Sequence, residues 1–496
     1  MIAASAKSRS PGIGKCIEHL YKQVRTFQYT NGGRLPYHFH PDADDRPEPL
    51  MAERNRIYRI GTGAGFAADR LDPAVDLARR GKLDVMVLEC LGERTVAFAH
   101  RDRLADPRRG YNHLLDRRMR ALLPVCRASG TTVITNMGAA NPRAAAERTR
   151  EIARDFGISG LKIACIEGDD VSGLLSADQP FMDEPGTIAS IDRKIVGMNA
   201  YLGADAIVPA LDAGADVVIG GRLADPSMYL APLMRHFRWK DSDALAAGTL
   251  VGHLMECGMQ ITGGYFADPG IKDVPDLAQC GYPIAEVSAD GGAVITKLPE
   301  TGGFVTEATV KEQLLYEVHD PEKYLTPDVT ADFSRVEIKD HGNDRVQVSN
   351  AAGQTRPDHL KVTIGFDAGV LAEAGISYAG PSAGSRGRLA AEIIESRLKD
   401  THGLKSVIRI DLIGARSLFA TAGKVNIDSE DVRLHVATRT TNREEAELLL
   451  WEVEALLCCG PAGGGGFRGV ITPAIMTKSV LIDRTIVHPT FEIFET

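Results

Sequence analysis

The segment Leu83-Asp-Val-Met-Val-Leu-Glu89 is a short apolar run with two valines that ends in one acidic residue. Apolar runs of this kind recur along the first half of the chain, at positions 58–60, 131–135, 161–166, 206–208 and 215–219. Segments with helical spacing lie among them, at 73–80, 114–128 and 142–156. Near-continuous apolar strands that alternate with helices are typical of a parallel sheet covered on both faces. We therefore expect an α/β fold with a parallel, doubly wound sheet.

The chain length and the change in the pattern of apolar residues along it predict more than one domain. The chain has 496 residues, whereas a single hydrophobic core usually stops growing near ~250–300 residues. Residues 1–55 end in a charged, proline-rich stretch, so we expect an N-terminal extension and linker there. Residues 56–280 carry the strand–helix alternation and predict an α/β Rossmann-like domain. From residue 281 the apolar residues alternate with polar ones before two strong helices, so 281–496 predict a second, mixed α+β domain.

Charge and cysteine usage exclude several classes of protein. The net charge is −9 and no long Lys/Arg run occurs, which disfavours nucleic-acid binding. Arginines gather between positions 101 and 120, as either a solvated helix surface or a patch that faces an anion or a subunit. No apolar stretch reaches the ~18 residues of a membrane span. The eight cysteines are dispersed without a C-x-x-C pair, so we expect no zinc ribbon and a reducing, cytoplasmic location.

The glycines after the first apolar run are the first candidate site. In open α/β sheets, ligands bind outside the carboxyl ends of the strands. Gly61, Gly63 and Gly65 approach the dinucleotide fingerprint, with Glu89 as its acidic residue, but Phe66 stands where the last glycine belongs. The alternatives are a tight βα turn, or glycine amides that bind an anion beside Asp69 and Arg70. The dinucleotide alternative would make the protein an NAD(P)-dependent dehydrogenase.

Two further strand ends carry polar residues. Asn136 and Gly138 follow the run at 131–135, and Gly221 and Arg222 follow the run at 215–219. Arg222 is predicted to hold a substrate carboxylate in bidentate fashion, oriented by Asp225. The alternative is a structural Arg–Asp ion pair.

The segment around Glu256 contains the densest group of reactive side chains. On a helix over 244–257, His253, Glu256 and Cys257 share one face at i, i+3 and i+4. Glu256 would serve as a general acid or base, and Cys257 as a nucleophile if positive charge lowers its pKa. His253 and Glu256 also offer two metal ligands, but no further ligands can be named, so we predict no metal. The alternative is a structural cysteine with a solvated glutamate.

Glycine amides are candidate ligand-binding groups at two more places. Gly263 and Gly264 follow Glu256 closely and are candidate oxyanion donors. Near the C-terminus, four consecutive glycines, Gly463 to Gly466, precede Arg468. Gly463, Gly464, Gly465 and Arg468 are predicted to bind a phosphate or a pantetheine arm, although the G-K-[ST] ending of a P-loop is absent. The alternative is a mobile loop.

Together these motifs resemble the acyclic terpene utilisation A (AtuA-like) family from about Arg59 to the C-terminus. The resemblance rests on Phe66-x-x-Asp69-Arg70, Glu93, Asn136-x-Gly138-x-x-Asn141-Pro142, Gly221-Arg222-x-x-Asp225, Glu256-Cys257-Gly258-x-Gln260-x-Thr262-Gly263-Gly264, Leu325-Thr-Pro-Asp328 and Gly460-Pro-Ala-Gly463. It implies catabolism of a branched carboxylic acid or acyl-CoA, with a coenzyme A thioester as substrate, and names no reaction. Longer relatives carry an extra C-terminal module and others are encoded beside a small protein, so the resemblance also implies a small partner subunit.

Two functions besides the dehydrogenase remain open from the sequence. The first is a lyase- or hydratase-type enzyme, in which Arg222 holds a carboxylate, Glu256 moves a proton and glycine amides stabilise an oxyanion. The second is a non-catalytic subunit that binds an acyl ligand or scaffolds a small partner protein. In either case we expect a homo-oligomer.

Overall fold

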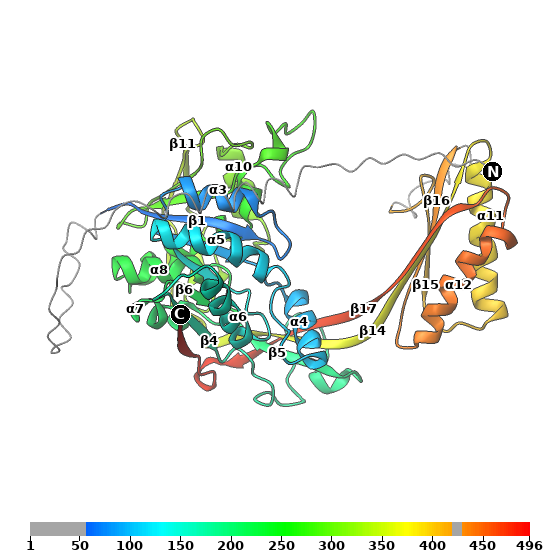
Figure 1. The fold of residues 1–496 in the computed structure, drawn as a ribbon, viewed down its shortest axis with the longest axis horizontal. Helices are drawn as coiled ribbons and strands as arrows, with labels where there is room; N and C mark the ends of the chain where they lie inside the picture. The colour runs from blue at the N-terminus through cyan, green and yellow to red at the C-terminus, as the bar shows by residue number, and fades with distance from the viewer. Residues whose placement is uncertain (1–55, 419–428) are drawn as a thin grey trace. The chain divides into compact units, whose positions relative to one another are not determined.

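The computed structural model describes residues 56–418 and 429–496. These residues form a mixed α/β protein with several sheets (Figure 1), which confirms the predicted α/β class. The predicted parallel sheet is present as part of a larger, mixed sheet. The predicted extension and linker at 1–55 lie outside the described residues.

The largest sheet has ten strands in the order β11-β12-β8-β7-β1-β2-β3-β6-β4-β18. Five neighbouring strands are parallel: β1 (Tyr58–Gly65), β2 (Val85–Glu89), β3 (Thr132–Thr135), β6 (Val217–Ile219) and β4 (Lys162–Glu167). The antiparallel strands that extend it are β7 (Pro283–Val287), β8 (Ala293–Lys297), β12 (Val346–Ser349), β11 (Glu337–Asp340) and β18 (Thr490–Glu495). The carboxyl ends of the parallel strands therefore meet at one edge of the sheet.

Helices cover both faces of this sheet, which explains why its central strands are apolar throughout. On one face, Val85 and Val87 join a core with α7 (Ala204–Asp212), α8 (Ser227–Phe237) and α9 (Ser242–Glu256). On the other face, Met86 and Leu88 join a core with α3 (Asp72–Arg80), α5 (Leu115–Ser129) and α6 (Pro142–Asp155). Each fully buried side chain of this size contributes about 1.5–3 kcal/mol, so both faces stabilise the sheet.

Two local predictions are wrong. The run at 206–208, expected as a strand, lies inside α7, because its buried residues repeat with a helical period (Ala206, Ile207, Ala210 and Leu211). The tight turn expected after residue 60 is strand instead, since β1 continues to Gly65. A Cβ on Gly61 would lie 2.5 Å from a methyl carbon of Leu83, so this glycine allows close packing within the sheet. The turn on which the dinucleotide alternative depended is therefore absent.

The alternating pattern after residue 281 forms antiparallel strands, and β11 and β12 pair as a hairpin. They join the same sheet as β1. The domain boundary at residue 280 stays a prediction. A small three-stranded sheet and one helix complete this part of the chain: β9 (Tyr324–Leu325), β10 (Thr330–Asp332), β13 (Ala352–Gln354) and α10 (Glu307–Leu315). In the first half of the chain, α4 (Glu93–Ala105) follows β2.

One long strand contributes to two cores. The first half of β14 (His359–Ala379) pairs with β5 (Ile195–Ala200), and its Val362 and Ile364 lie in the same core as β1. Its second half contributes Ile376 to a separate core. That core contains residues of α11 (Ala383–Ser396), α12 (Arg443–Cys459), β15 (Ile408–Ile413), β16 (Asp431–Thr440) and β17 (Gly465–Asp483). None of the helices in the described residues has the length and apolar composition needed to cross a bilayer.

Candidate functional site

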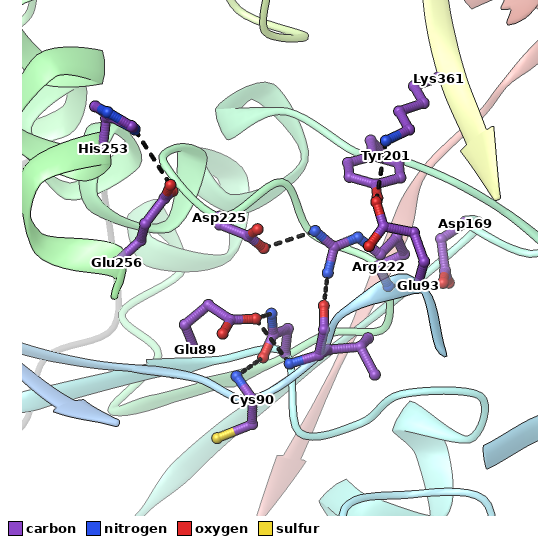
Figure 2. A network of polar contacts seen from close by, with 12 residues as sticks. Glu89, Cys90, Glu93, Asp169, Tyr201, Arg222, Asp225, His253, Glu256 and Lys361 are labelled. Carbon is purple, nitrogen blue, oxygen red and sulfur yellow. Dashed lines mark hydrogen bonds and ion pairs between the residues drawn. The ribbon is translucent and has the colours of Figure 1, made fainter. Parts of the chain in front are cut away.

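A buried arginine lies at the carboxyl edge of the large sheet, just after β6 (Figure 2). Arg222 is 1% exposed. Its Nη2 donates to Asp225 Oδ1 at 2.6 Å, and its Nη1 donates to the carbonyl of Leu91. The ring of Tyr201 lies 4.2 Å from its Cζ. These contacts fix the guanidinium beneath a partly exposed carboxylate.

The glycine before this arginine is required by the packing of its backbone. The backbone N–H of Arg222 donates to Asp169 Oδ2 at 2.8 Å. A Cβ on Gly221 would lie 2.3 Å from the same oxygen. Asp169 also accepts from Asn199, whose side-chain oxygen lies 2.6 Å from His100 Nε2. A buried chain of hydrogen bonds therefore holds the Arg222 backbone in place.

Glu89 is the last residue of β2 and is 9% exposed. Its Oε1 accepts from the backbone of Leu91 at 2.7 Å and from Asn136 Nδ2 at 3.0 Å. Burial and the nearby Asp225 carboxylate raise its pKa to about 8, against the opposing effect of Arg222. Near neutral pH this carboxyl therefore carries a proton.

Glu256 ends α9 beside His253. Burial is the main cause that raises the Glu256 pKa to about 7, while His253, which lies 3.4 Å away through Nδ1, opposes the shift. Its second oxygen, Oε2, is buried and has no hydrogen-bond partner. This is the predicted acid or base, and its pKa lies near the working pH of such a group.

The other ring nitrogen of His253 determines how this pair shares protons. Nε2 lies 3.2 Å from the carbonyl of Leu314. A carbonyl only accepts, so Nε2 carries a hydrogen. A hydrogen bond between Nδ1 and Glu256 then requires one further proton, on the ring or on the carboxyl.

The end of α9 packs directly against β1. A Cβ on Gly65 would lie 2.3 Å from the Cys257 carbonyl carbon and 2.5 Å from the backbone carbonyl oxygen of Glu256. Thr62 Oγ1 donates to the Met255 carbonyl at 3.0 Å and contacts the Tyr229 hydroxyl at 2.9 Å. The first strand therefore positions Glu256 through backbone contacts.

A second ion pair lies at the exposed side of the cluster. Lys361 Nζ lies 3.0 Å from Glu93 Oε1, and the Tyr201 hydroxyl donates to the same oxygen at 2.5 Å. Burial disfavours the ionised form of Glu93, but Lys361, Tyr201 and Arg222 outweigh it and lower its pKa to about 2. Tyr201 thus connects this pair to Arg222.

We call Glu89, Glu93, Tyr201, Arg222, Asp225, His253, Glu256 and Lys361 the carboxyl-edge cluster. Of the predicted residues, it brings together Arg222, Asp225, His253 and Glu256, with Asn136 and Gly221 as supports. The predicted bidentate grip of Arg222 on a substrate is restricted, because both terminal nitrogens already have protein partners. Burial raises the pKa of Cys257, which disfavours the thiolate needed by the predicted nucleophile.

Several predicted ligand-binding residues have structural partners instead. The amides of Gly263 and Gly264 donate to the carbonyls of Gln260 and Met259 at 3.1 and 2.8 Å, so neither offers a free N–H to an oxyanion. Gly138 packs against the Gly220 carbonyl, which a Cβ would approach to 2.5 Å.

The loop between β1 and α3 carries Asp69 and Arg70. Asp69 accepts the N–H of Gly65 at 2.8 Å, and Arg70 donates to the carbonyl of Ala278 at 3.0 Å. Beneath the loop, Arg118 is 1% exposed and donates to Cys90 Sγ at 2.8 Å. This arginine is therefore not part of the solvated surface considered above for positions 101–120.

The glycine-rich stretch near the C-terminus does not join the carboxyl-edge cluster. Gly465 pairs with Ser377 on β14, the strand that also bears Lys361. An extended strand rises roughly 3.3 Å per residue, which places these two positions roughly 50 Å apart along β14. Gly464 instead lies near Ile376 and Tyr378. Arg468 is exposed and donates to the carbonyl of Phe467.

The site also contains residues that were not predicted for it, and they are of two kinds. Glu89, predicted only as the acidic residue of a dinucleotide site, ends β2, and Asp169 follows β4 closely. Their position at the carboxyl edge can be predicted from the strand pattern. Tyr201 and Lys361 are far apart in the chain and meet because the Tyr201 N–H donates to the Lys361 carbonyl at 2.9 Å. No local pattern predicts that contact.

The metal alternative lacks a third ligand. Within residues 56–418 and 429–496, no three His, Cys, Asp or Glu side chains are grouped so that they could hold a metal ion. A cavity of about 40 Å³ lies at the opposite edge of the sheet, lined in part by Thr131, Thr132 and Asp216. That volume fits only about three water molecules, and the cavity lies away from the carboxyl edge, so it does not extend the site.

The comparisons with known proteins agree with the motifs. The family model described as "Acyclic terpene utilisation family protein AtuA" matches residues 58–493. No curated protein matches the chain.

Proposed function

We propose, since this chain belongs to the AtuA family of acyclic terpene utilisation proteins, that it is a catabolic enzyme for a branched carboxylic acid or its acyl-CoA thioester. The proposed reaction is hydration or dehydration, a lyase-type reaction, at the carboxyl-edge cluster. The family supports a role in acyclic terpene utilisation. The chemistry is our inference from the cluster.

One observation carries the proposal: two buried carboxyls, Glu256 at the end of α9 and Glu89 at the end of β2, have pKa values raised to about 7 and about 8. Pairs of carboxyls whose environments separate their pKa values are how enzymes obtain an acid and a base at one pH. Both carboxyls can therefore exchange a proton near neutral pH. We assign Glu256 as the base, because its Oε2 has no protein partner, and Glu89 as the acid.

The proposed step balances as follows. Ionised Glu256 takes a proton from water while the water oxygen attacks the β-carbon of an α,β-unsaturated acyl group. The α-carbon takes a proton from Glu89, so the carbon–carbon double bond becomes a hydroxyacyl product. Dehydration is the reverse. Because Glu256 Oε2 has no protein partner, it is the oxygen that we assign to the water.

The test is a hydration assay with a panel of branched enoyl-CoA thioesters. Hydration is monitored as the loss of absorbance of the conjugated enoyl thioester. We expect turnover by the wild type and its loss in Glu256→Gln, which keeps the size of the side chain. Glu447→Gln is the control, because Glu447 lies exposed on α12 in an ion pair with Arg443. Full activity in Glu256→Gln would remove that residue from the mechanism.

A second candidate function is a non-catalytic acyl-binding or scaffold subunit that works with a small partner protein. It is supported by the separation of Gly463, Gly464, Gly465 and Arg468 from the carboxyl-edge cluster. Calorimetry with acyl-CoA thioesters, with and without such a partner, distinguishes the two, because heat without product favours the subunit. A cytoplasmic location and a homo-oligomer remain part of the proposal on sequence grounds alone.

A further inference from the structure

The exposed part of the carboxyl-edge cluster carries more negative than positive groups. The side chains of Glu93, Asp225 and Glu256 are 42%, 31% and 15% exposed. The exposed cation beside them is Lys361, at 39%. Arg222 is 1% exposed and lies behind Asp225. A ligand that enters the cluster therefore meets carboxyl groups before it meets the guanidinium.

Both cations are already paired. Lys361 lies 3.0 Å from Glu93 and Arg222 lies 2.6 Å from Asp225. A free carboxylate in the cluster would have to displace one of these partners and would remain close to the displaced charge. At such distances like charges repel strongly even at a partly solvated site. The charge pattern therefore works against an anionic ligand.

Two buried polar atoms of the same cluster have no partner: Arg222 Nε and Glu256 Oε2. The guanidinium N–H is only a donor, so its complement is an oxygen acceptor. A carboxyl oxygen accepts a hydrogen bond when ionised, so its complement is a hydroxyl group or water. Buried polar atoms without a partner cost about 1–3 kcal/mol each, and a ligand with a carbonyl and a hydroxyl satisfies both.

We infer that the carboxyl-edge cluster selects an uncharged ligand that bears a carbonyl and a hydroxyl group, namely a branched hydroxyacyl thioester, over the corresponding free carboxylate. The carbonyl oxygen accepts from Arg222 and the hydroxyl bonds Glu256. The acyl nature of the ligand rests on the proposed function. The selection by charge rests on the paired cations and the exposed carboxyls.

The test compares the binding affinities of matched ligands for the full chain by calorimetry. Each branched 3-hydroxy acid in a chain-length series is paired with its N-acetylcysteamine thioester, which is uncharged and lacks the phosphates of coenzyme A. We expect at least one thioester to bind the wild type about tenfold or more tightly than its free acid, as a screened like-charge repulsion predicts.

Two opposite variants test whether charge is the cause. Glu93→Gln frees Lys361 and should strengthen binding of the free acid about fivefold, whereas Lys361→Met frees Glu93 and should weaken it. The thioester carries no charge, so the ratio of acid to thioester affinity, measured for each variant, isolates the effect of charge. Calorimetric unfolding shows that both variants are folded.

Three results would overturn the inference: equal or tighter binding of the free acid, no binding of any thioester, or an unchanged acid-to-thioester ratio in Glu93→Gln. Failure of the proposed function is a separate result. If the protein binds thioesters selectively but turns none of them over, the inferred selectivity stands and the proposed enzymatic function fails.

Discussion

Two glutamates in this molecule lie beside a histidine and close to an arginine, yet their pKa values shift in opposite directions. The Glu452 carboxylate on α12 accepts hydrogen bonds from Nε and Nη2 of Arg397, at 2.7 and 2.9 Å. Its Oε1 lies 2.6 Å from His402 Nε2. These bonds lower its pKa. Glu256 has one long contact to His253 and an oxygen without a partner, and burial raises its pKa to about 7.

The difference lies in hydrogen bonding and not in residue type. A buried carboxylate is stabilised when its oxygens accept from cations, and destabilised when burial leaves an oxygen without a donor. The Glu452 group is therefore complete and structural. Glu256 lacks a hydrogen-bond partner for Oε2, as is typical of a side chain that binds substrate or water. Four experiments follow from this contrast, from the largest expected effect to the smallest.

Glu256→Gln and Glu452→Gln should separate activity from stability. Loss of a general acid or base typically costs 10²–10⁴-fold in rate, so Glu256→Gln should lower turnover by about that factor. It should not lower the unfolding temperature, because Oε2 loses no partner and ionisation of Glu256, whose pKa is raised to about 7, already costs the folded wild type stability near neutral pH. Glu452→Gln should do the opposite: full turnover, with unfolding about 2–4 °C lower. Steady-state kinetics and calorimetric unfolding on both variants are the measurements. The contrast breaks if both variants lose activity equally.

Gly65→Ala should have the next largest effect, on both stability and turnover. Its Cβ would lie 2.3 Å from a backbone carbon of Cys257, which cannot move as a flexible side chain can. We expect destabilisation by about 1–3 kcal/mol and loss of turnover, because the end of α9 carries Glu256. The matched control is Gly465→Ala in the glycine-rich stretch, where no atom lies within 4 Å of the new carbon.

Gly465→Ala should change stability by less than about 0.5 kcal/mol. Urea unfolding of both variants compares the two regions directly. Equal destabilisation by the two substitutions would contradict the packing that we describe between β1 and α9.

The stability of Glu89→Gln should depend on pH in a direction set by the raised pKa of Glu89. Below the unfolded-state pKa of about 4.3 the carboxyl is protonated in both states and has no effect. As pH rises toward the folded value of about 8, ionisation costs more in the folded state, so the wild type loses stability. Glu89→Gln should therefore unfold at a higher temperature than the wild type at pH 9, and not at pH 4.

Glu452 should show the reverse dependence. Its lowered pKa means that its stabilising contribution is complete above about pH 4.3 and disappears as pH falls through the folded value. The deficit of Glu452→Gln should thus be constant from pH 6 to 9 and shrink in acid. Unfolding temperatures across the pH range test both variants. A deficit that grows in acid would contradict the ion-paired geometry.

Much of the fold was readable from local patterns, because periodicity reports burial. The helix expected at 142–156 is found at Pro142–Asp155, and the two helices expected after residue 281 are found at Ala383–Ser396 and Arg443–Cys459. The run at 206–208 failed because three apolar residues fit either a strand or a helix. Only the flanking alanines of α7 decide between them.

The candidate site was readable only in part. Arg222 and Glu256 stand at a strand end and a helix end, which the sequence marks with glycines. The acidic residue Glu89 is equally visible, but its raised pKa comes from burial and then from the nearby Asp225, and both depend on the fold. Tyr201 and Lys361 meet through pairing of distant segments. Tertiary pairing, and not local sequence, therefore sets the charge of the cluster.

The most direct test of the account is the protonation state of Glu256. Infrared difference spectra between wild type and Glu256→Gln isolate the carbonyl stretch of this one carboxylic acid as pH is varied. We predict a protonated band at pH 5.5 that disappears with a midpoint near pH 7, and no such band in the corresponding comparison for Glu452→Gln. A Glu256 carboxyl that is already ionised at pH 5.5 would contradict the account.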